Sequence, residues 1–242
     1  MLVCLSRMST NDYQHAAARY TLRGISGNDA LAFRWLKERL PCASANMRAL
    51  DLGCGSGRST RFLQALGFET SGIDVSAAMV AQARQHNPTG DYYTYTAETP
   101  LPFPDATFDI ILSTWVVLEL APFHQLAVFM RNAARVLKPS GTAFIVTNTP
   151  AFYAHRWLSC AIDFPENTIP LRSGQKVKAR LMPEDVVVTD VFWHDDDYRN
   201  AFAEAGLTVQ TAAFPQAPAE EAAHWADEIH AAPYVIYEVQ RL

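Results

Sequence analysis

Three glycines stand close together in residues 49–60, which read ALDLGCGSGRST. Gly53, Gly55 and Gly57 alternate with small residues, directly behind a short apolar run that contains Asp51. Glycine adopts positive φ angles without strain and has no Cβ, so a bulky ligand can lie directly against such a backbone. The same spacing would also suit a tight turn from a strand into a helix that binds nothing.

A second acid favours the binding interpretation. Asp74 ends the next apolar segment, about 20 residues after Gly53, where an acid accepts hydrogen bonds from the two hydroxyls of a ribose. Together with the glycine turn, Asp74 predicts a site for an adenosine-type ligand. The dinucleotide fingerprint G-x-G-x-x-G is incomplete, because Arg58 stands at its sixth position, and a Walker loop would need lysine there.

The segments that must position this turn alternate between strand and helix patterns. We expect strands at residues 48–53, 69–76, 91–98, 108–117 and 141–148, and helices at residues 30–40, 57–66, 77–86 and 124–137. Asn28 or Asp29 would cap the helix at 30–40. This alternation predicts an α/β fold, a Rossmann-like, doubly wound, mostly parallel seven-stranded sheet. Two antiparallel edge strands are expected at residues 207–214 and 233–242.

The pattern changes after residue 148, where prolines and a basic stretch interrupt the alternation. Residues 177–182 and 186–193 are expected to form a hairpin around the turn at 183–185. We therefore expect a single domain over residues 1–242, with a helical lid over residues 1–40. Residues 149–194 would form an inserted cap that binds the substrate.

Composition limits the classes of function. The chain has 242 residues, of which 49% are hydrophobic and 19% charged, with a formal net charge of -5. An acidic balance argues against nucleic-acid binding, which needs clustered lysine and arginine. No apolar run approaches the roughly 20 residues of a membrane span. The 4 cysteines show no C-x-x-C pair, so we expect a cytoplasmic protein without a bound metal. From the charge and the lack of a long apolar run, we expect no nucleic-acid partner and no membrane partner.

Several motifs together resemble one family. D-L-G-C-G-S-G followed by G-I-D-V-S resembles the first two motifs of the class I S-adenosylmethionine-dependent methyltransferases. AETPLPFPDATFDII (97–111) and RVLKPSGTAFI (135–145) resemble further regions of that family, and WHDDDYRNAFAEAGL resembles its element before the edge strands. The resemblance extends over residues 13–242. It implies S-adenosyl-L-methionine as cofactor, S-adenosyl-L-homocysteine as product, and a small-molecule acceptor.

The resemblance also implies cofactor-binding residues. They are Tyr13, Tyr20, Arg23, Asp51, Gly53, Gly55, Asp74, Val75, Met79, Ala97, Glu98, Ser113 and Trp115. Asp74 would accept both ribose hydroxyls, and Val75 and Met79 would pack on the adenine. Tyr13 and Tyr20 would belong to the lid. Core packing is the alternative for Met79, and docking of a helix is the alternative for the two tyrosines.

The catalytic and substrate-binding residues are expected near the cap. His194, His155 and Tyr20 are the candidates for catalysis, and Trp115, Phe152, Trp157, Trp193 and His194 are the candidates for substrate binding. A histidine here could remove a proton from the acceptor, and an aromatic face attracts the positive sulfonium. For each histidine taken singly, a surface or helix-capping role is the competing interpretation, and for each cap aromatic it is packing within the cap.

These observations predict methyl transfer from S-adenosylmethionine to an O or N atom of a small, planar or heteroaromatic metabolite. The reaction would be an in-line displacement in an enzyme of secondary metabolism, acting as a monomer or homodimer. Two alternatives remain open, a nucleotide-dependent oxidoreductase and a non-catalytic cofactor-binding partner of another protein. Methylation of RNA or protein is disfavoured by the acidic charge and the short cap.

Overall fold

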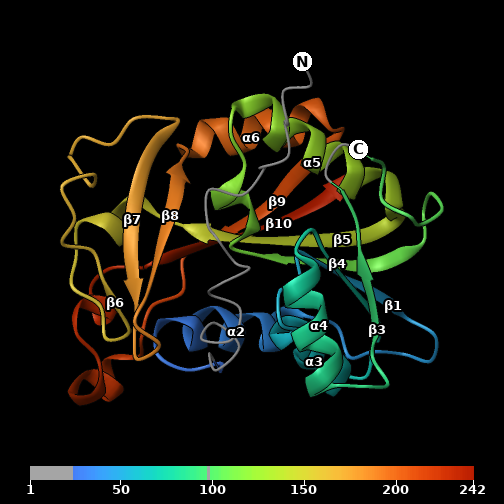
Figure 1. The fold of residues 1–242 in the computed structure, drawn as a ribbon, viewed down its shortest axis with the longest axis horizontal. Coiled ribbons are helices and arrows are strands. Elements are labelled where there is room, and N and C mark those ends of the chain that lie inside the picture. Colours follow the sequence, from blue (N-terminus) through green and yellow to red (C-terminus); the bar gives the residue numbers. More distant parts are fainter. Residues whose placement is uncertain (1–23, 97–98) are drawn as a thin grey trace.

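The computed structural model describes residues 24–96 and 99–242 (Figure 1). Five of the predicted cofactor residues lie outside these ranges: Tyr13, Tyr20, Arg23, Ala97 and Glu98. The predicted lid lies only partly within them, so its role stays a prediction.

The described part of the chain forms a seven-stranded sheet. Its spatial order is β3 (Asp91–Thr94), β2 (Glu69–Asp74), β1 (Arg48–Leu52), β4 (Phe108–Thr114), β5 (Leu137–Asn148), β10 (Tyr234–Arg241) and β9 (Leu207–Ala213). The first five strands are parallel, and β10 runs antiparallel to both β5 and β9. This arrangement confirms the predicted Rossmann-like sheet with antiparallel edge strands. The chain crosses from β3 to β4 on the other side of β1, which puts the topological switch point between β1 and β4.

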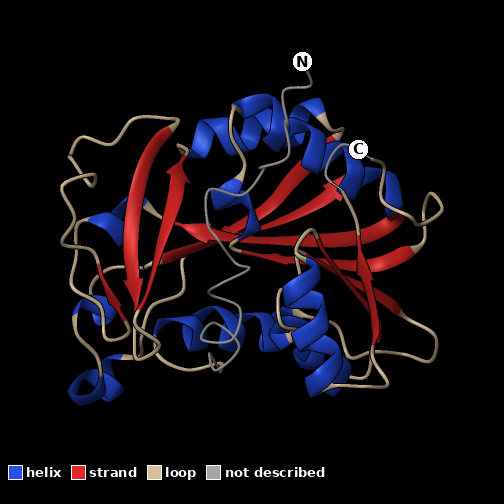
Figure 2. Ribbon diagram, in the orientation of Figure 1, coloured by secondary structure: helices blue, strands red, loops and turns tan. Residues whose placement is uncertain are grey.

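Helices cover both faces of this sheet (Figures 1 and 2). The elements on one face are α2 (Asn28–Arg39), α3 (Arg58–Ala65) and α4 (Ala77–His86), and those on the other are α5 (Phe123–Val136) and α6 (Asp195–Glu204). Short 3₁₀ turns follow β4, β5 and β9: η1 (Val116–Glu119), η2 (Pro150–Tyr153), η3 (Ala219–His224) and η4 (Asp227–Ile229). The apolar stripe of α5 packs on the sheet through Leu126, Met130 and Ala133, all of them buried. No helix in the described ranges combines the length and apolar character needed to cross a bilayer.

The start of α2 corrects one expectation. Gly27 is the N-cap, and Asn28 and Asp29 are already the first two helical residues. Asn28 donates its backbone N–H to Ser159 Oγ at 2.9 Å, and its Oδ1 accepts from that hydroxyl at 2.8 Å. The prediction that Asn28 or Asp29 caps the helix was therefore wrong. Asn28 instead ties α2 to the segment between β5 and α6.

That segment forms a second, three-stranded antiparallel sheet of β6 (Cys160–Ala161), β7 (Gln175–Leu181) and β8 (Val186–Phe192). The hairpin predicted around residues 183–185 is confirmed by the pairing of β7 with β8. Val177 and Phe192 of this small sheet share one buried cluster with Phe144 and Ile236 of the large sheet. The two sheets are therefore joined by a common apolar core.

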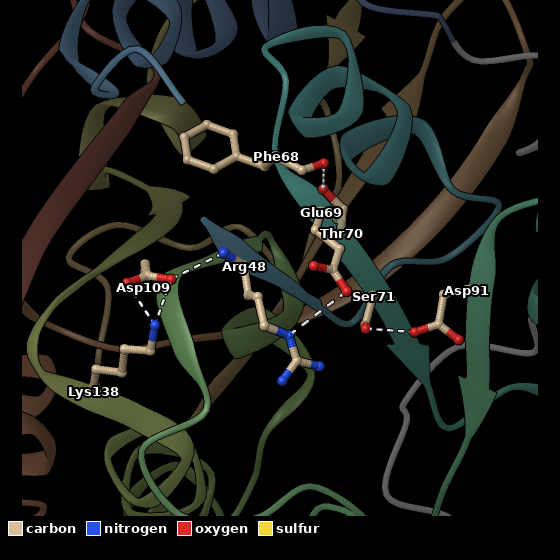
Figure 3. A network of polar contacts seen from close by, with 8 residues as sticks. All are labelled: Arg48, Phe68, Glu69, Thr70, Ser71, Asp91, Asp109 and Lys138. Atoms are coloured by element: carbon tan, nitrogen blue, oxygen red, sulfur yellow. Dashed lines mark hydrogen bonds and ion pairs between the residues drawn. The ribbon is translucent and has the colours of Figure 1, made fainter. Parts of the chain in front are cut away.

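Polar contacts connect the amino-terminal ends of the parallel strands (Figure 3). Asp109 accepts a hydrogen bond from the backbone N–H of Arg48 at 2.9 Å and binds Lys138 Nζ at 2.8 Å, joining β1, β4 and β5. Ser71 Oγ donates to Asp91 at 2.6 Å, joining β2 and β3. Ligands of such sheets bind at the carboxyl ends of the strands, so this network fixes the strands at the edge away from the expected site.

Candidate cofactor and substrate site

A cavity lies at the carboxyl ends of the parallel strands, between the large sheet and the small one. Asp74 at the end of β2, Thr114 at the end of β4 and Asn148 at the end of β5 line it. Asp190 of β8 lines it from the small sheet. The turn between β1 and α3 reaches it through Gly53 and Gly55. The cavity therefore begins at the switch point and extends to the cap.

Gly53 and Gly55 of the glycine turn differ in the space beside them. Gly53 has a φ of 85°, and a Cβ built there would lie 2.1 Å from Val116 Cγ2, so this position is filled by the protein itself. Gly55 has a φ of 50°, and a Cβ there would meet nothing within 4 Å. Because Gly55 lines the cavity, the open space beside it is available to a ligand. A flat group could lie against the Gly55 backbone.

Asp74 holds the glycine turn and still faces the cavity. Its Oδ2 accepts the backbone N–H of Gly55 at 2.8 Å, and its Oδ1 accepts that of Ser76 at 2.8 Å. Burial raises the pKa of Asp74, while the N–H donors act in the opposite direction. A carboxylate has about four acceptor positions, so each oxygen keeps one for a further donor. This geometry suits a group that presents two neighbouring hydroxyls.

Asp51 lies behind the turn and does not line the cavity. It is fully buried, and its carboxylate accepts hydrogen bonds from Ser59 Oγ at 2.8 Å and from Thr60 Oγ1 at 2.6 Å. Burial raises the pKa of Asp51 to about 6, against the lowering effect of the two hydroxyls. In this arrangement Asp51 fixes the first turn of α3 relative to β1, and a ligand would contact it only through that turn.

Of the two residues predicted at the end of β4, Trp115 lines the cavity and Ser113 does not. Ser113 is fully buried and lies outside the lining, whereas its neighbour Thr114 lines the cavity. Successive side chains of a strand point to opposite faces, so Thr114 faces the cavity and the predicted residue Ser113 does not. Trp115 lines the cavity with a φ of 61°, an uncommon conformation for a bulky residue. Its indole Nε1 is buried and has no hydrogen-bond partner among residues 24–96 and 99–242.

A charged network that the sequence reading missed stands beside Trp115. The Arg58 guanidinium lies 5.3 Å from the centroid of the Trp115 ring and 2.5 Å from Asp29 Oδ2. Asp29 Oδ1 accepts from the hydroxyl of Tyr234 at 3.0 Å. Arg58, Asp29 and Tyr234 all line the cavity and come from α3, α2 and β10. The sequence offers no signal for this meeting, because Asp29 and Tyr234 stand 205 positions apart.

The cap end of the cavity carries a second polar group that was not predicted. Asn148 Nδ2 donates to Tyr153 Oη at 3.0 Å, and Tyr153 donates to Asp190 Oδ2 at 3.4 Å. Burial raises the pKa of Asp190 to about 8, and the Glu119 carboxylate adds to that rise. Asn148 is the last residue of β5, and Glu119 ends the η1 turn that follows β4, positions that could have marked them as candidates.

Comparison with known proteins agrees with this geometry. Residues 50–145 match a family described as "Methyltransferase domain". The chain is 36% identical over 136 residues to the biotin biosynthesis bifunctional protein BioHC of Cellvibrio japonicus, covering 56% of this chain and 26% of that protein. It is 36% identical over 164 residues to a ubiquinone biosynthesis O-methyltransferase of a Chelativorans species, covering 66% of this chain and 58% of that protein.

Residues 50–145 belong to the family described as a methyltransferase domain, and the chain is similar to class I S-adenosylmethionine-dependent methyltransferases. Its fold agrees with the crystal structure of an S-adenosylmethionine-dependent methyltransferase from Mesorhizobium loti. The TM-score is 0.64 at 21% identity, with 89% of this chain and 100% of that chain covered. A Methanosarcina mazei methyltransferase structure gives a TM-score of 0.61 at 16% identity, over 83% and 95% of the two chains. In the sequence comparisons, the chain spans between 26% and 58% of the lengths of the two relatives described above.

The cofactor of the class I methyltransferases is S-adenosylmethionine, and the cavity of this protein fits it in three respects. The Asp74 carboxylate has free acceptor positions at the end of β2, and the side of Gly55 is open. Met79 is buried beneath the cavity, while Val75 is 44% exposed at its rim. This pair offers an apolar surface of the kind that an adenine ring packs on. The individual contacts remain predictions.

Only some of the predicted substrate residues line the cavity. Trp115 and Phe152 line the cavity. Trp157 stacks on Phe152 and donates its indole N–H to the Phe152 carbonyl at 2.7 Å. Trp193 donates to the Leu120 carbonyl at 3.1 Å. Trp157 and Trp193 therefore support the cavity from outside its lining.

Neither His194 nor His155 lines the cavity. His194 is the N-cap of α6, and its Nε2 lies 3.2 Å from the Leu171 carbonyl oxygen. His155 Nδ1 lies 3.5 Å from the Asp227 carboxylate, with 42% of the histidine side chain exposed. The base role predicted for the two histidines has no support from these positions.

Asp190 should make the stability of the protein depend on pH. Its folded pKa of about 8 lies above the ordinary value of 3.8, so the folded protein keeps a proton that the unfolded chain has lost. The free energy of unfolding should therefore fall as the pH rises from about 4 to about 8. Asp190→Asn should lack this pH-dependent fall in the free energy of unfolding. Between pH 5 and pH 8, its free energy of unfolding should rise by more than about 1 kcal/mol relative to that of the wild type. Urea unfolding at both pH values measures it.

The matched control is Asp185→Asn, in the exposed turn between β7 and β8. Its unfolding free energy should follow the wild-type pH profile. Parallel profiles for Asp190→Asn and the wild type would contradict the raised pKa.

Proposed function

We propose that this chain transfers the methyl group of S-adenosylmethionine to an O or N atom of a small molecule bound under the cap. One observation carries the proposal. A single cavity begins at the glycine turn and Asp74 and continues to Phe152 and Asp190. Donor and acceptor could therefore bind at its two ends, with their reacting atoms facing each other near the carboxyl end of β4.

Methyl transfer depends mainly on how the methyl donor and the acceptor are positioned. S-adenosylmethionine supplies a methyl group activated by positive sulfur. Asp74 would orient the ribose, and the Gly55 backbone would let the nucleoside lie against the turn. The cap would place the acceptor and exclude water. Orientation of this kind can lower the activation barrier by about 7–11 kcal/mol. The ring of Trp115 would face the positive charge, which such an aromatic surface attracts.

The names of the ubiquinone and demethylmenaquinone enzymes fit a small-molecule acceptor, whereas the malonyl-[acyl-carrier protein] enzyme is named for an acceptor carried on a protein. Relatives include a ubiquinone biosynthesis O-methyltransferase, a demethylmenaquinone methyltransferase at 38% identity over 99 residues, and a malonyl-[acyl-carrier protein] O-methyltransferase at 32% over 112 residues. These names describe acceptors of different shape, so the planar or heteroaromatic acceptor is a narrower proposal. It rests on the aromatic rings of Trp115, Phe152 and Tyr234 along the cavity.

Calorimetry and a turnover assay test the function. We expect S-adenosylhomocysteine to bind the purified protein with at least tenfold higher affinity than NAD, a difference of about 1.4 kcal/mol. We also expect methylated product from a panel of phenols, carboxylates and amines. Tighter binding of NAD would favour the oxidoreductase alternative. Tight S-adenosylhomocysteine binding without turnover on any acceptor would favour a non-catalytic partner protein.

A further inference from the structure

Two polar atoms on the wall of the cavity have no hydrogen-bond partner within residues 24–96 and 99–242. One is Oδ1 of Asn148, a lining residue that is 6% exposed. The other is the indole Nε1 of Trp115, which also lines the cavity. Burial deprives such an atom of water, so nearly all buried polar atoms of native proteins have a partner. A ligand in the cavity could supply both missing partners.

The two side chains stand at the ends of neighbouring strands. Asn148 is the last residue of β5, and Trp115 directly follows β4, which pairs with β5 in parallel. The backbone N–H of Trp115 donates at 2.9 Å to the carbonyl of Val146, two positions before Asn148. Tyr234 is opposite Asn148 in the pairing of β10 with β5, and its ring centroid lies 5.0 Å from that of Trp115. One ligand group could therefore reach both side chains.

The other end of the Asn148 amide is already occupied. Its Nδ2 donates to the Tyr153 hydroxyl at 3.0 Å, and Tyr153 lies outside the lining of the cavity. Tyr153 in turn donates to Asp190 Oδ2 at 3.4 Å. The Asp190 carboxyl group keeps its proton at pH 7, because burial raises its pKa to about 8. These uncharged contacts position the amide and leave its Oδ1 to a donor of the ligand.

An uncharged hydroxyl group matches this pair of atoms. Asn148 Oδ1 requires a donor and Trp115 Nε1 requires an acceptor. A hydroxyl group carries one donor and two acceptor positions on a single oxygen. An ammonium group has donors alone, and a carboxylate has acceptors alone. Either ion would therefore leave one of the two atoms without a partner.

We propose that Asn148 Oδ1 and Trp115 Nε1 together bind a hydroxyl group of the methyl-acceptor substrate. This proposal rests on the proposed function and narrows its acceptor to hydroxylated aromatic compounds. The hydroxyl group donates to Asn148 and accepts from Trp115. Phe152 stacks against Tyr234 with ring centroids 5.9 Å apart, and Trp115 contacts Tyr234 edge to face. The aromatic body of the acceptor packs among these three rings.

Pairs of ligands that differ only in a hydroxyl or a methyl group test this proposal. The probes are phenol and toluene, 5-hydroxyindole and 5-methylindole, and 6-hydroxyquinoline and 6-methylquinoline, titrated at pH 7 into protein saturated with S-adenosylhomocysteine. A phenolic hydroxyl has a pKa of about 10 and stays uncharged at this pH. In at least one pair the hydroxyl compound should bind at least tenfold more tightly than the methyl compound, a difference of about 1.4 kcal/mol.

Variants assign this hydroxyl preference to the two side chains. Trp115→Phe keeps an aromatic ring without the indole N–H, and Asn148→Ala removes the amide; each should reduce the preference to about threefold or less. The preference is a ratio measured within one variant, so a general loss of affinity leaves it unchanged. Trp35→Phe on α2 and Asn200→Ala on the exposed side of α6 are matched controls outside the lining, and they should keep the wild-type preference. Circular dichroism checks that each variant is folded.

A hydroxyl preference absent from all three pairs would overturn this assignment, and so would one that survives in Trp115→Phe or in Asn148→Ala. Either result leaves the proposed function standing when S-adenosylhomocysteine binds and methylated product forms. Absence of S-adenosylhomocysteine binding would instead overturn the proposed function. The hydroxyl preference, measured in the ligand-free protein, would then still decide whether Asn148 and Trp115 bind a hydroxyl group.

Discussion

Replacement of Asp74 by alanine should weaken binding of S-adenosylhomocysteine by about a hundredfold. The variant loses two hydrogen bonds from ribose hydroxyls to a carboxylate, each worth about 1.5–3 kcal/mol. It also leaves the backbone N–H groups of Gly55 and Ser76 without the acceptor that orients them. Isothermal titration calorimetry on the purified variant measures the loss.

Two further variants separate ribose binding from support of the turn. Asp74→Asn keeps one side-chain oxygen as acceptor, so its affinity should lie between those of the wild type and Asp74→Ala. Asp91→Ala removes an acid of β3 that accepts a hydrogen bond from Ser71 of β2, outside the cavity lining, and this variant should bind like the wild type. An Asp74→Ala protein that is folded and binds with wild-type affinity would refute the ribose assignment.

Replacement of Gly55 by alanine should weaken binding of the same ligand by about thirtyfold, or roughly 2 kcal/mol, a value typical of overpacking. The new methyl group meets no protein atom within 4 Å, so it enters the space that the nucleoside would occupy. A folded state with a positive φ also costs alanine about 1–2 kcal/mol. Stability and affinity should therefore both fall.

Gly206→Ala is the matched control for backbone strain. Gly206 has a φ of 69° and also lacks neighbours within 4 Å, but it follows α6 away from the cavity. Both variants should lose similar unfolding free energy in urea, whereas Gly55→Ala alone should lose affinity. Equal affinities in the two variants would mean that the turn beside Gly55 is not in contact with the cofactor.

The parallel part of the fold follows from local patterns in the sequence. The helix over residues 77–86 was predicted with its observed limits, because Ser76 caps it and Asn87 ends its apolar pattern. β4 was predicted to be longer than it is. Its apolar run continues into η1, since Trp115 turns the chain with a positive φ that hydrophobicity does not reveal.

The two ends of the site differ in how far the sequence predicts them. Gly53, Gly55 and Asp74 lie within about 20 residues of one another, so motif spacing brings them together. Asp190 and Asn148 come from different sheets, and their meeting depends on how the small sheet packs on the large one. Spacing along the chain carries no information on that packing. The histidines were chosen for their chemistry, whereas the acids that line the cap end were overlooked.

The place of β10 in the sheet has a consequence for biosynthesis. This strand is made after β9 but lies between β9 and β5, and its Tyr234 closes the wall beside Asp29. While the chain emerges from the ribosome, β5 has no neighbour on that side until residues 234–241 arrive. The nascent polypeptide therefore gains a complete binding chamber only after residues 234–241 have left the ribosome.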